Sequence, residues 1–598
     1  MRGALMAQRK QAYPVAQLTG GVDISVDAAF LVDKASPDLR NVRYDQGLIR
    51  KGLGWKQFGT VAADGLPLDG TPILLDSFPL ESGTIHYLAA TTKWLYRYIS
   101  ATGKFEKKNK QATTGALAMT FVASTKKITR AAGSFVTDGF TEDTIITTDA
   151  VLNPGPFTVV TVAALEMVVL ETVVDEGPVT KTAIGIIPYT GDEDNRFSTV
   201  ITLTSGGTEI YVITNGKDPI QKWDGTNNPC IDLPGWSASP VTAKSLCLHK
   251  SRLIAGYTVE TGTNCPRRVR WSAVGNPEDI TGSGSGFVDI VDTSDWVVAV
   301  VVLKDRLFVF KERSIWELPY VGGTAVYGAP ILKVDGVGTY SQQSIINLGD
   351  EIMFYGSDNV YTYDGIDLTP MSKQIYGLLY DTEKKIVNSE KINRSPASYI
   401  EELQTYQLCV PTEGDLPALL LTYDFNTESW QLRDKAITAF GYYSVPMGNT
   451  WMDLVGDWNA QTWEWMEKKL AAGSPTTLIA TADGYLWEDD RKTKSTDLMY
   501  VTTKDWLFAH GQRWTEIRIQ AKGGPFEVSY SLDEGHTWSS SKTFPYTDPE
   551  GPFFEHVLWI DRTSQHIRVK VVCTAQDLDI KWMEPWYIPR KRSKSVVS

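Results

Sequence analysis

The sequence predicts an all-β protein built around a β-propeller. Short units recur in which an apolar strand, a polar turn and an aromatic strand are followed by Asp-Gly, as in residues 208–226 and 349–365. Their spacing of roughly 45 to 60 residues is typical of propeller blades, which are too small to bury their own faces. The composition agrees, because 49 Gly and 29 Pro among 598 residues, with 19 Trp and 26 Tyr, favour strands broken by many turns.

The repeat predicts about seven blades, with six to eight allowed. We assign the propeller to residues 61–114 and 186–500. A set of unrelated hairpins in stacked sandwiches is the alternative. The candidate units are residues 93–107, 208–226, 250–280, 304–320, 349–365, 418–432 and 476–490.

Other segments fall outside this period. Residues 115–185 contain strands separated by a Gly turn and by "NPGP", which predicts a small β-barrel inserted in the first blade. Residues 501–590 alternate at period two, as in a terminal β-sandwich. Residues 591–598 form a basic tail, which is either solvated or docks on an acidic partner. Residues 462–473 and, more weakly, 372–385 are the best helix candidates.

The N-terminal arm, residues 1–60, has a Gly-Gly turn and then a hairpin with Gly at its tip, "LRNVRYDQGLIRKG". Few of its apolar residues are contiguous, so we expect a neighbour to order it. Our hypothesis is that the arm serves assembly and that a chain without residues 1–50 folds but does not assemble. The residues expected to matter are Gly20, Gly21, Pro37, Asn41, Arg43, Gly47, Arg50 and Gly54.

The stretch "YSLDEGHTW" fits the pattern Ser-x-Asp-x-Gly-x-Thr-Trp and resembles the Asp-box of sialidases and other propeller proteins. It predicts a structural hairpin turn. Asp533 can accept backbone N–H groups, Gly535 can take a positive φ, and Trp538 can cover the apolar side of the hairpin. A buried ring would make Trp538→Ala cost roughly 3–5 kcal/mol. The full motif is Ser531, Asp533, Gly535, Thr537 and Trp538.

The net charge argues against tight DNA binding, and the reactive residues argue against catalysis. The formal net charge is -13, whereas a protein that binds DNA by neutralising its phosphates should be basic. Five dispersed cysteines without a CxxC pair do not suggest zinc or disulfides, and six histidines form no metal motif. A sialidase needs arginines from several blades, whereas Arg267, Arg268 and Arg270 share one strand. We therefore expect no enzyme, no cofactor and no metal.

Several stretches together resemble the tail nozzle or hub proteins of short-tailed bacteriophages. The arm resembles their opening, and residues 295–318 and 340–365 resemble their blades. Residues 128–162 are similar to an accessory domain seen in phage structural proteins, and "VRWSAVGNPEDI" resembles a strand and turn common in the family. The pieces cover most of the chain, and their order carries the resemblance.

The resemblance implies a homohexameric ring below the portal-adaptor (head–tail connector), in a virion assembled in the host bacterial cytoplasm. Tail fibre or tailspike proteins would attach to it, and DNA would pass through the channel without specific binding. No apolar run is long enough for a transmembrane helix, and the N-terminus is a poor secretion signal. The alternatives are a receptor-binding or glycan-depolymerising tail protein and a cellular propeller scaffold.

Overall fold

The computed structural model confirms the predicted β-rich fold. In the described residues nearly all regular structure is β-strand. The structure describes residues 9–13, 19–45, 47–58, 66–100, 102–238, 241–381, 384–444, 475–575 and 577–589.

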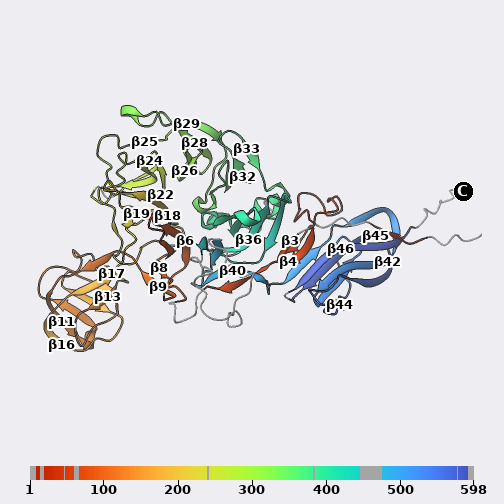
Figure 1. The fold of residues 1–598 in the computed structure, drawn as a ribbon, viewed down its shortest axis with the longest axis horizontal. Helices are drawn as coiled ribbons and strands as arrows, with labels where there is room; N and C mark the ends of the chain where they lie inside the picture. The colour runs from red at the N-terminus through yellow and green to blue at the C-terminus, as the bar shows by residue number, and fades with distance from the viewer. Residues whose placement is uncertain are drawn as a thin grey trace, which may run out of the picture.

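Six separate four-stranded antiparallel sheets are arranged as propeller blades (Figure 1). This number lies within the predicted range of six to eight. In each sheet the strands pair in chain order, except that the outermost strand of the last sheet comes from the N-terminal arm. The blades are β6 (Pro72–Pro79), β7 (Ile85–Thr91), β8 (Leu95–Ile99) and β9 (Lys104–Lys107); β18 (Ser198–Leu203), β19 (Glu209–Thr214), β20 (Gln221–Trp223) and β21 (Ile231–Asp232); β22 (Val241–His249), β23 (Arg252–Glu260), β24 (Thr263–Trp271) and β25 (Gly286–Asp289); β26 (Val297–Leu303), β27 (Arg306–Lys311), β28 (Ser314–Leu318) and β29 (Ile331–Asp335); β30 (Ile346–Asn347), β31 (Ile352–Tyr355), β32 (Val360–Tyr363) and β33 (Leu368–Pro370); and β38 (Ala439–Ser444), β39 (Pro475–Ala480), β40 (Leu486–Lys494) and β5 (Leu53–Gln57).

A further four-stranded unit lies in the ring between the β30–β33 blade and the last blade. One of its faces shares a core with the β30–β33 blade, through Tyr406 and Met353. The other face packs on the last blade, through Cys409 and Ile479. This unit is not a separate sheet, because its last strand pairs in parallel with a strand of the arm. It consists of β34 (Ala397–Ile400), β35 (Thr405–Pro411), β36 (Pro417–Asp424) and β37 (Ser429–Arg433).

The C-terminal strands form two faces around one core. The long strands β42 and β45 pair with each other, and β45 then continues alongside β41 and β43. The strands are β41 (Met499–Thr502), β42 (Trp506–Gly523), β43 (Phe526–Ser531), β44 (Lys542–Phe544), β45 (Phe554–Cys573) and β46 (Leu578–Ile588).

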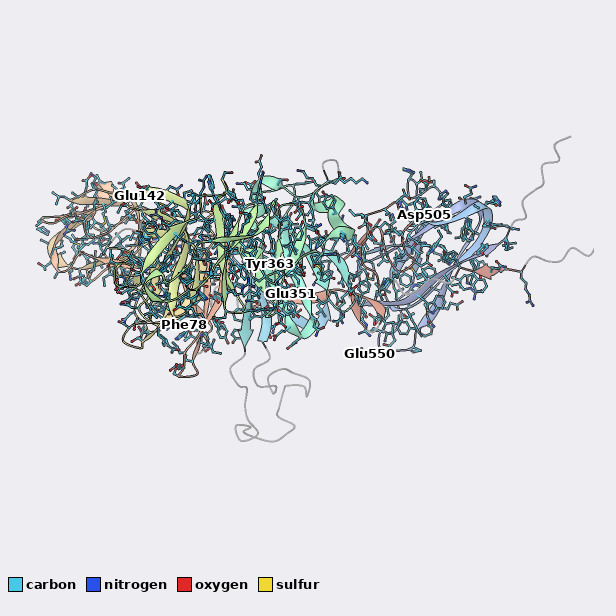
Figure 2. All side chains as sticks on the ribbon, turned by 90° about the horizontal axis from the view of Figure 1, so that it is seen from above. Phe78, Glu142, Glu351, Tyr363, Asp505 and Glu550 are labelled. Atoms are coloured by element: carbon cyan, nitrogen blue, oxygen red, sulfur yellow. The ribbon has the colours of Figure 1, made fainter. Side chains whose placement is uncertain are left out.

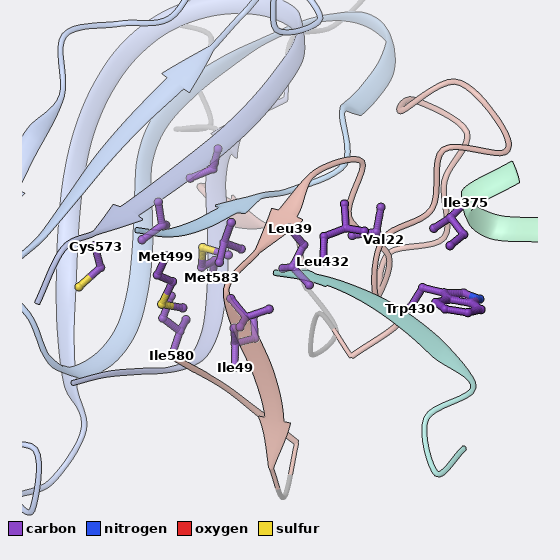
Figure 3. Packing of buried hydrophobic residues seen from close by; sticks show 14 of the residues in the cluster. Val22, Leu39, Ile49, Ile375, Trp430, Leu432, Met499, Cys573, Ile580 and Met583 are labelled. Carbon is purple, nitrogen blue, oxygen red and sulfur yellow. The ribbon is translucent and has the colours of Figure 1, made fainter. Parts of the chain in front are cut away.

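The arm lies between the propeller and the C-terminal domain and pairs with strands of both. Its strand β2 pairs with both β37 and β41, and β4 pairs with β46. The β34–β37 unit, the arm and the C-terminal strands therefore belong to one fourteen-stranded sheet. They share one continuous hydrophobic core (Figure 3). The arm strands are β1 (Gln11–Ala12), β2 (Leu39–Arg40), β3 (Val42–Asp45) and β4 (Leu48–Lys51).

The insertion forms its own eight-stranded sheet, curved around its own core, with β10 and β16 at the edges. It projects from the side of the ring opposite the C-terminal domain (Figures 1 and 2). Its strands are β10 (Gln111–Thr113), β11 (Leu117–Val122), β12 (Lys127–Arg130), β13 (Ile145–Thr148), β14 (Phe157–Val162), β15 (Glu166–Val169), β16 (Glu176–Lys181) and β17 (Ala183–Ile186).

Helical structure is scarce in the described residues. The candidate at 372–385 contains only two short helical segments, η4 and α1, which are held by packing of Ile375 and Leu379 in the shared core. The candidate at 462–473 lies outside the described residues. No described helix is long and apolar enough to cross a membrane. The helical segments are η1 (Ala123–Thr125), η2 (Gly323–Ala325), η3 (Gln342–Ser344), η4 (Lys373–Ile375), α1 (Tyr376–Leu379), η5 (Ser389–Arg394) and η6 (Glu401–Leu403).

Candidate functional site

The Gly-Gly turn of the arm lies against the propeller. Gly21 has a φ of 71°, and a Cβ atom there would lie 2.5 Å from the carbonyl oxygen of Trp430. The next residue, Val22, donates its N–H to that same carbonyl at 2.9 Å. A side chain at position 21 would break this contact, so glycine is required by close approach as well as by conformation.

Asn41 fastens the arm to both neighbouring domains. Its φ of 58° is left-handed, and its side chain is buried. The side-chain amide donates to the carbonyl of Leu498 at 2.7 Å and to the Asp434 carboxylate at 3.2 Å, and it accepts the Asp434 N–H at 3.0 Å. Asn is one of the few residues that tolerates this backbone while offering both a donor and an acceptor.

Basic residues of the arm point into the C-terminal domain. Lys51 is buried and donates to the carbonyls of Thr574 and Ala575 at 3.2 and 2.6 Å, and burial lowers the pKa of its amine. Arg50 lies 3.8 Å from the carboxylate of Asp579. We use the name joint for arm residues 19–52 together with their contacts to the propeller and to the C-terminal domain.

The remaining predicted arm residues also belong to the subunit's own structure. Pro37 follows the bridge between Val22 and Ser36, Arg43 lies in β3, and Gly47 turns the β3–β4 hairpin with a φ of 77°. Gly54 lies in β5 at the edge of the last blade. The neighbour that orders the arm is thus its own chain, and in the Discussion we give a different expectation for a chain without residues 1–50.

The Asp-box-like motif forms the turn of the β43–β44 hairpin. Asp533 accepts the Thr537 N–H at 2.9 Å and the Thr537 hydroxyl at 2.5 Å. Hydrogen bonds from Thr537, and then from Ser531, lower the pKa of Asp533 to about 2. Gly535 has a φ of 93° and donates its N–H to the Ser531 hydroxyl at 2.9 Å. The motif satisfies its own polar groups, and beside it Glu534 lies 3.5 Å from His566 Nε2, whose Nδ1 lies 2.6 Å from the Asp505 carboxylate.

Trp538 covers the hairpin less than expected. Its ring is half-buried and lies under the Lys570 amine, 4.2 Å from the ring centre. The β43–β44 hairpin instead buries Phe526 and Phe544, which contact each other with ring centres 5.3 Å apart. The cost expected for a buried ring at position 538 therefore does not apply.

A cluster at one end of the propeller axis joins blades that are not neighbours. Arg196 precedes β18 and donates to the carbonyl of Thr438, before β38, at 3.2 Å, and to that of Arg394, before β34, at 2.7 Å. Burial, and then the nearby Arg394 guanidinium, lower the pKa of Arg196 to about 10. Arg394 donates to Asp194 at 2.6 Å, and this bond lowers the pKa of that carboxyl. We call Asp194, Arg196, Arg394 and Thr438 the axial hub.

The sequence analysis missed the axial hub, although a signal was present. An Asn-Arg pair precedes the first strand of two different units, as Asn195-Arg196 and Asn393-Arg394. Each arginine stands just before the first strand of its unit, where segments from different sides of the ring meet across its axis.

Two of the three arginines of residues 267–270 form ion pairs, and the third, Arg267, donates to the Ser294 carbonyl at 2.9 Å. Arg268 binds Asp289 through two contacts of 2.7 and 2.8 Å, and Arg270 binds Glu260 at 2.7 Å. In the part of the chain that the structure describes, no three His, Cys, Asp or Glu side chains are placed to hold a metal ion. The five cysteines are free thiols, and burial raises the pKa of Cys230 to about 12.

Comparison with known proteins adds little. No family model and no curated protein matches the sequence. One similar solved structure is the dihydro-heme d1 dehydrogenase NirN in complex with DHE, at 10% identity and a TM-score of 0.27, covering 56% of each chain. Another is Hsv2 of Kluyveromyces lactis, at 11% identity and a TM-score of 0.24, covering 61% of this chain and 97% of that one. This chain thus spans little more than half of NirN, and likenesses this weak carry no argument about function.

Proposed function

We propose that this protein is a non-catalytic structural subunit of a short-tailed phage tail, the nozzle or hub. The observation that carries the proposal is the joint. Val22, Leu39 and Ile49 of the arm are buried in one core with the propeller and the C-terminal domain. A subunit that closes a pressurised DNA channel has to transmit force between its ends without hinging, and a shared core provides this stiffness.

In this proposal DNA passes between copies of the subunit and not along the axis of one propeller. The axial hub supports this, because the buried guanidinium of Arg196 and the Arg394–Asp194 pair occupy that end of the axis. Six copies around a common channel would give a wall with an excess of carboxylates, since each chain carries a net charge of -13. Such a wall repels phosphates over about 8 Å at physiological salt, so DNA slides without binding.

The opposite ends of the elongated subunit would meet different partners. The C-terminal domain and the insertion project from different sides of the ring (Figure 1). Under the proposal, one end faces the portal-adaptor and the other is available to tail fibre or tailspike proteins in the virion. The predicted basic tail at 591–598 lies outside the described residues.

Reconstitution tests the proposal. The full-length chain is mixed with any portal and adaptor proteins found in the same genome, and the product is imaged by electron microscopy. We expect six copies in a ring below the adaptor. A chain that stays monomeric with both proteins present, or a neighbourhood without portal and capsid genes, would overturn the proposal.

A further inference from the structure

The first strands of the blades contact one another around the propeller axis. The Thr199 hydroxyl in β18 donates to the Asp76 carboxylate in β6 at 2.7 Å. The last blade meets the first where Gly441 of β38 faces Leu75 of β6, so closely that a Cβ atom on Gly441 would lie 2.5 Å from that of Leu75. These strands are therefore the wall of the axis, and β38 and β6 form the seam that closes the ring.

A cavity of about 570 Å³ lies between four of these first strands, β6, β30, β34 and β38. We call it the axial cavity. The axial hub includes residues just before β34 and β38, whereas the cavity reaches Ile400 and Tyr442, farther along the same two strands. The cavity thus lies toward the end of the axis away from the hub. Its volume is within the roughly 300–1,000 Å³ typical of small-molecule sites.

The charged residues that line the axial cavity are all acidic. Of the described residues, no lysine, arginine or histidine lines it. A wall with carboxylates and no basic group repels an anion and attracts a cation, and the attraction is strengthened where water is partly excluded. The acidic lining residues are Asp76, Glu401 and Glu402.

Asp76 is the deeper carboxylate, and no ion pair to it is found among the described residues. It accepts the Thr199 and Tyr211 hydroxyls at 2.7 and 2.8 Å and the Ser77 N–H at 2.8 Å, and all three donors are neutral. Burial raises the pKa of Asp76, and these hydrogen bonds offset the rise only in part. The residue is half-buried and lines the cavity, so a cation inside the cavity would stabilise its ionised form.

The mouth of the axial cavity combines an exposed carboxylate with an exposed aromatic ring. Glu401 is exposed and begins η6, directly after β34. Tyr442 is 40% exposed, and its hydroxyl is fixed by the Ser398 hydroxyl at 2.8 Å and by the Tyr399 carbonyl. Burial and the nearby Glu401 carboxylate raise the pKa of Tyr442. A cation at the mouth therefore meets a carboxylate and a fixed ring together.

The remaining lining favours an organic cation over a metal ion. Leu75, Ile346, Ala397 and Phe440 supply apolar surface. Methylene groups gain from contact with such surface, whereas a hydrated metal ion does not. In the parts of the chain that the structure describes, no three His, Cys, Asp or Glu side chains are placed to hold a metal ion.

We propose that the axial cavity binds a linear alkylamine with two or more ammonium groups. One ammonium group would pair with Asp76 and another with Glu401 beside Tyr442, and the methylene groups would contact the apolar lining. Because β6 and β38 both line the cavity, such a ligand would bridge the seam between the first and last blades. A lysine side chain carries the same ammonium group, so the source is either a free amine or a peptide.

Saturation-transfer NMR on the full-length protein tests this with 1,4-diaminobutane and spermidine at millimolar concentration. The neutral control ligand is 1,4-butanediol, and a peptide with the sequence of residues 590–598 represents the peptide source. Asp76→Asn removes the deeper charge at nearly constant volume, and Glu401→Lys reverses the charge at the mouth. Glu413→Lys is the matched control, because this exposed residue lies between β35 and β36 and the net charge changes equally.

We expect an amine, the peptide or both to bind the wild type, and butanediol not to bind. Affinity should fall by about tenfold or more in Asp76→Asn, because a bond to a charged group is lost. It should fall by about fivefold or more in Glu401→Lys and by no more than about twofold in Glu413→Lys. Whichever of amine and peptide binds at the lower concentration identifies the source of the ammonium group.

Three results would overturn the inference. Neither the amines nor the peptide transfer saturation, butanediol binds as well as diaminobutane, or Glu401→Lys and Glu413→Lys weaken binding equally. The last result would assign binding to the net charge of -13 and not to the cavity. If Asp76→Asn does not fold, the exposed Glu401→Lys decides alone. The nozzle proposal is untouched by any of these results, since it predicts the oligomer and not the ligand.

Discussion

The arm and the insertion are both additions to the propeller, but they are built in opposite ways. The insertion has a core of its own, with Phe121, Ile128 and Met167 fully buried among its own strands. The arm has buried apolar residues too, yet Leu39 and Ile49 pack only in the core shared with the propeller and the C-terminal domain. One addition is a self-sufficient domain, and the other exists only through its neighbours.

The insertion and the arm are also attached to the ring in different ways. The insertion enters and leaves the ring at one point, where Gln111 pairs with Ile186 and the Ile187 N–H reaches the Lys110 carbonyl at 2.9 Å. The arm instead pairs with β37, β41 and β46, strands that are far apart in the sequence. Removing the insertion should therefore leave a ring, whereas removing the arm should not.

Deletion of residues 1–50 has the largest expected effect. It removes Val22, Leu39, Val42 and Ile49 from the shared core, and each buried side chain of this kind contributes about 1.5–3 kcal/mol. The sum is comparable to the whole stability of a typical domain, roughly 5–15 kcal/mol. We expect an insoluble chain or one without a cooperative thermal transition in calorimetry. A soluble truncated monomer that melts cooperatively would restore the original assembly-only interpretation of the arm.

Trp430→Ala comes next. The ring is fully buried in the shared core, and its Nε1–H donates to the Met371 carbonyl at 2.9 Å. Loss of this side chain should lower the free energy of unfolding by about 3–5 kcal/mol, measured by urea denaturation. Trp538→Ala is the matched control, because its half-buried ring and its contact with Lys570 should cost only about 1–2 kcal/mol. Equal losses at the two positions would contradict the comparison.

Asn41 separates backbone from side-chain contributions at the joint. Asn41→Ala loses the hydrogen bonds to Leu498 and Asp434 and also strains a residue with φ of 58°, so we expect a loss of about 2–3 kcal/mol in unfolding free energy. Asn41→Gly loses the same bonds without the strain and should be less destabilised by about 1 kcal/mol. If the alanine and glycine variants melt at the same temperature, the left-handed backbone is not a source of strain at this position.

How far the sequence predicted this structure depends on the range of the interactions. The blades were visible because each is a local run of strand and turn, and the Asp-box-like turn was visible because Ser531 to Thr537 satisfy one another. The partners of the arm were not visible. Nothing near Asn41 in sequence indicates a bond to Leu498, 457 residues away.

The buried polar residues between the β34–β37 unit and the last blade were missed for a related reason. Thr405, Gln407 and Thr422 look like the polar face of an ordinary strand, and they are buried only because β5 and the arm hairpin close over them. The axial hub is similar, since Arg196 and Thr438 are 242 residues apart and meet only when the ring closes. Local periodicity can be read from a single sequence, whereas the contacts that form when the ring closes cannot.

Excision of the insertion is the smallest expected effect and completes the comparison. Because Lys110 and Ile187 are already hydrogen-bonded neighbours, residues 111–186 can be replaced by two glycines without moving the ends of the ring. The ring would lose the contacts of Ile145 and Ile186 with the core beside β6–β9 and the exposed Lys93–Asp143 pair, so we expect a change of no more than about 1–2 kcal/mol in calorimetry. The excised domain, expressed alone, should show its own cooperative transition, since every buried residue of its core lies between Ala112 and Ala183 and only the partly buried Ile187 packs on that core from outside residues 111–186. An unfolded isolated insertion, or a ring that fails to fold without it, would mean that the insertion depends on its neighbours as the arm does, and that a separate core does not by itself make this domain autonomous.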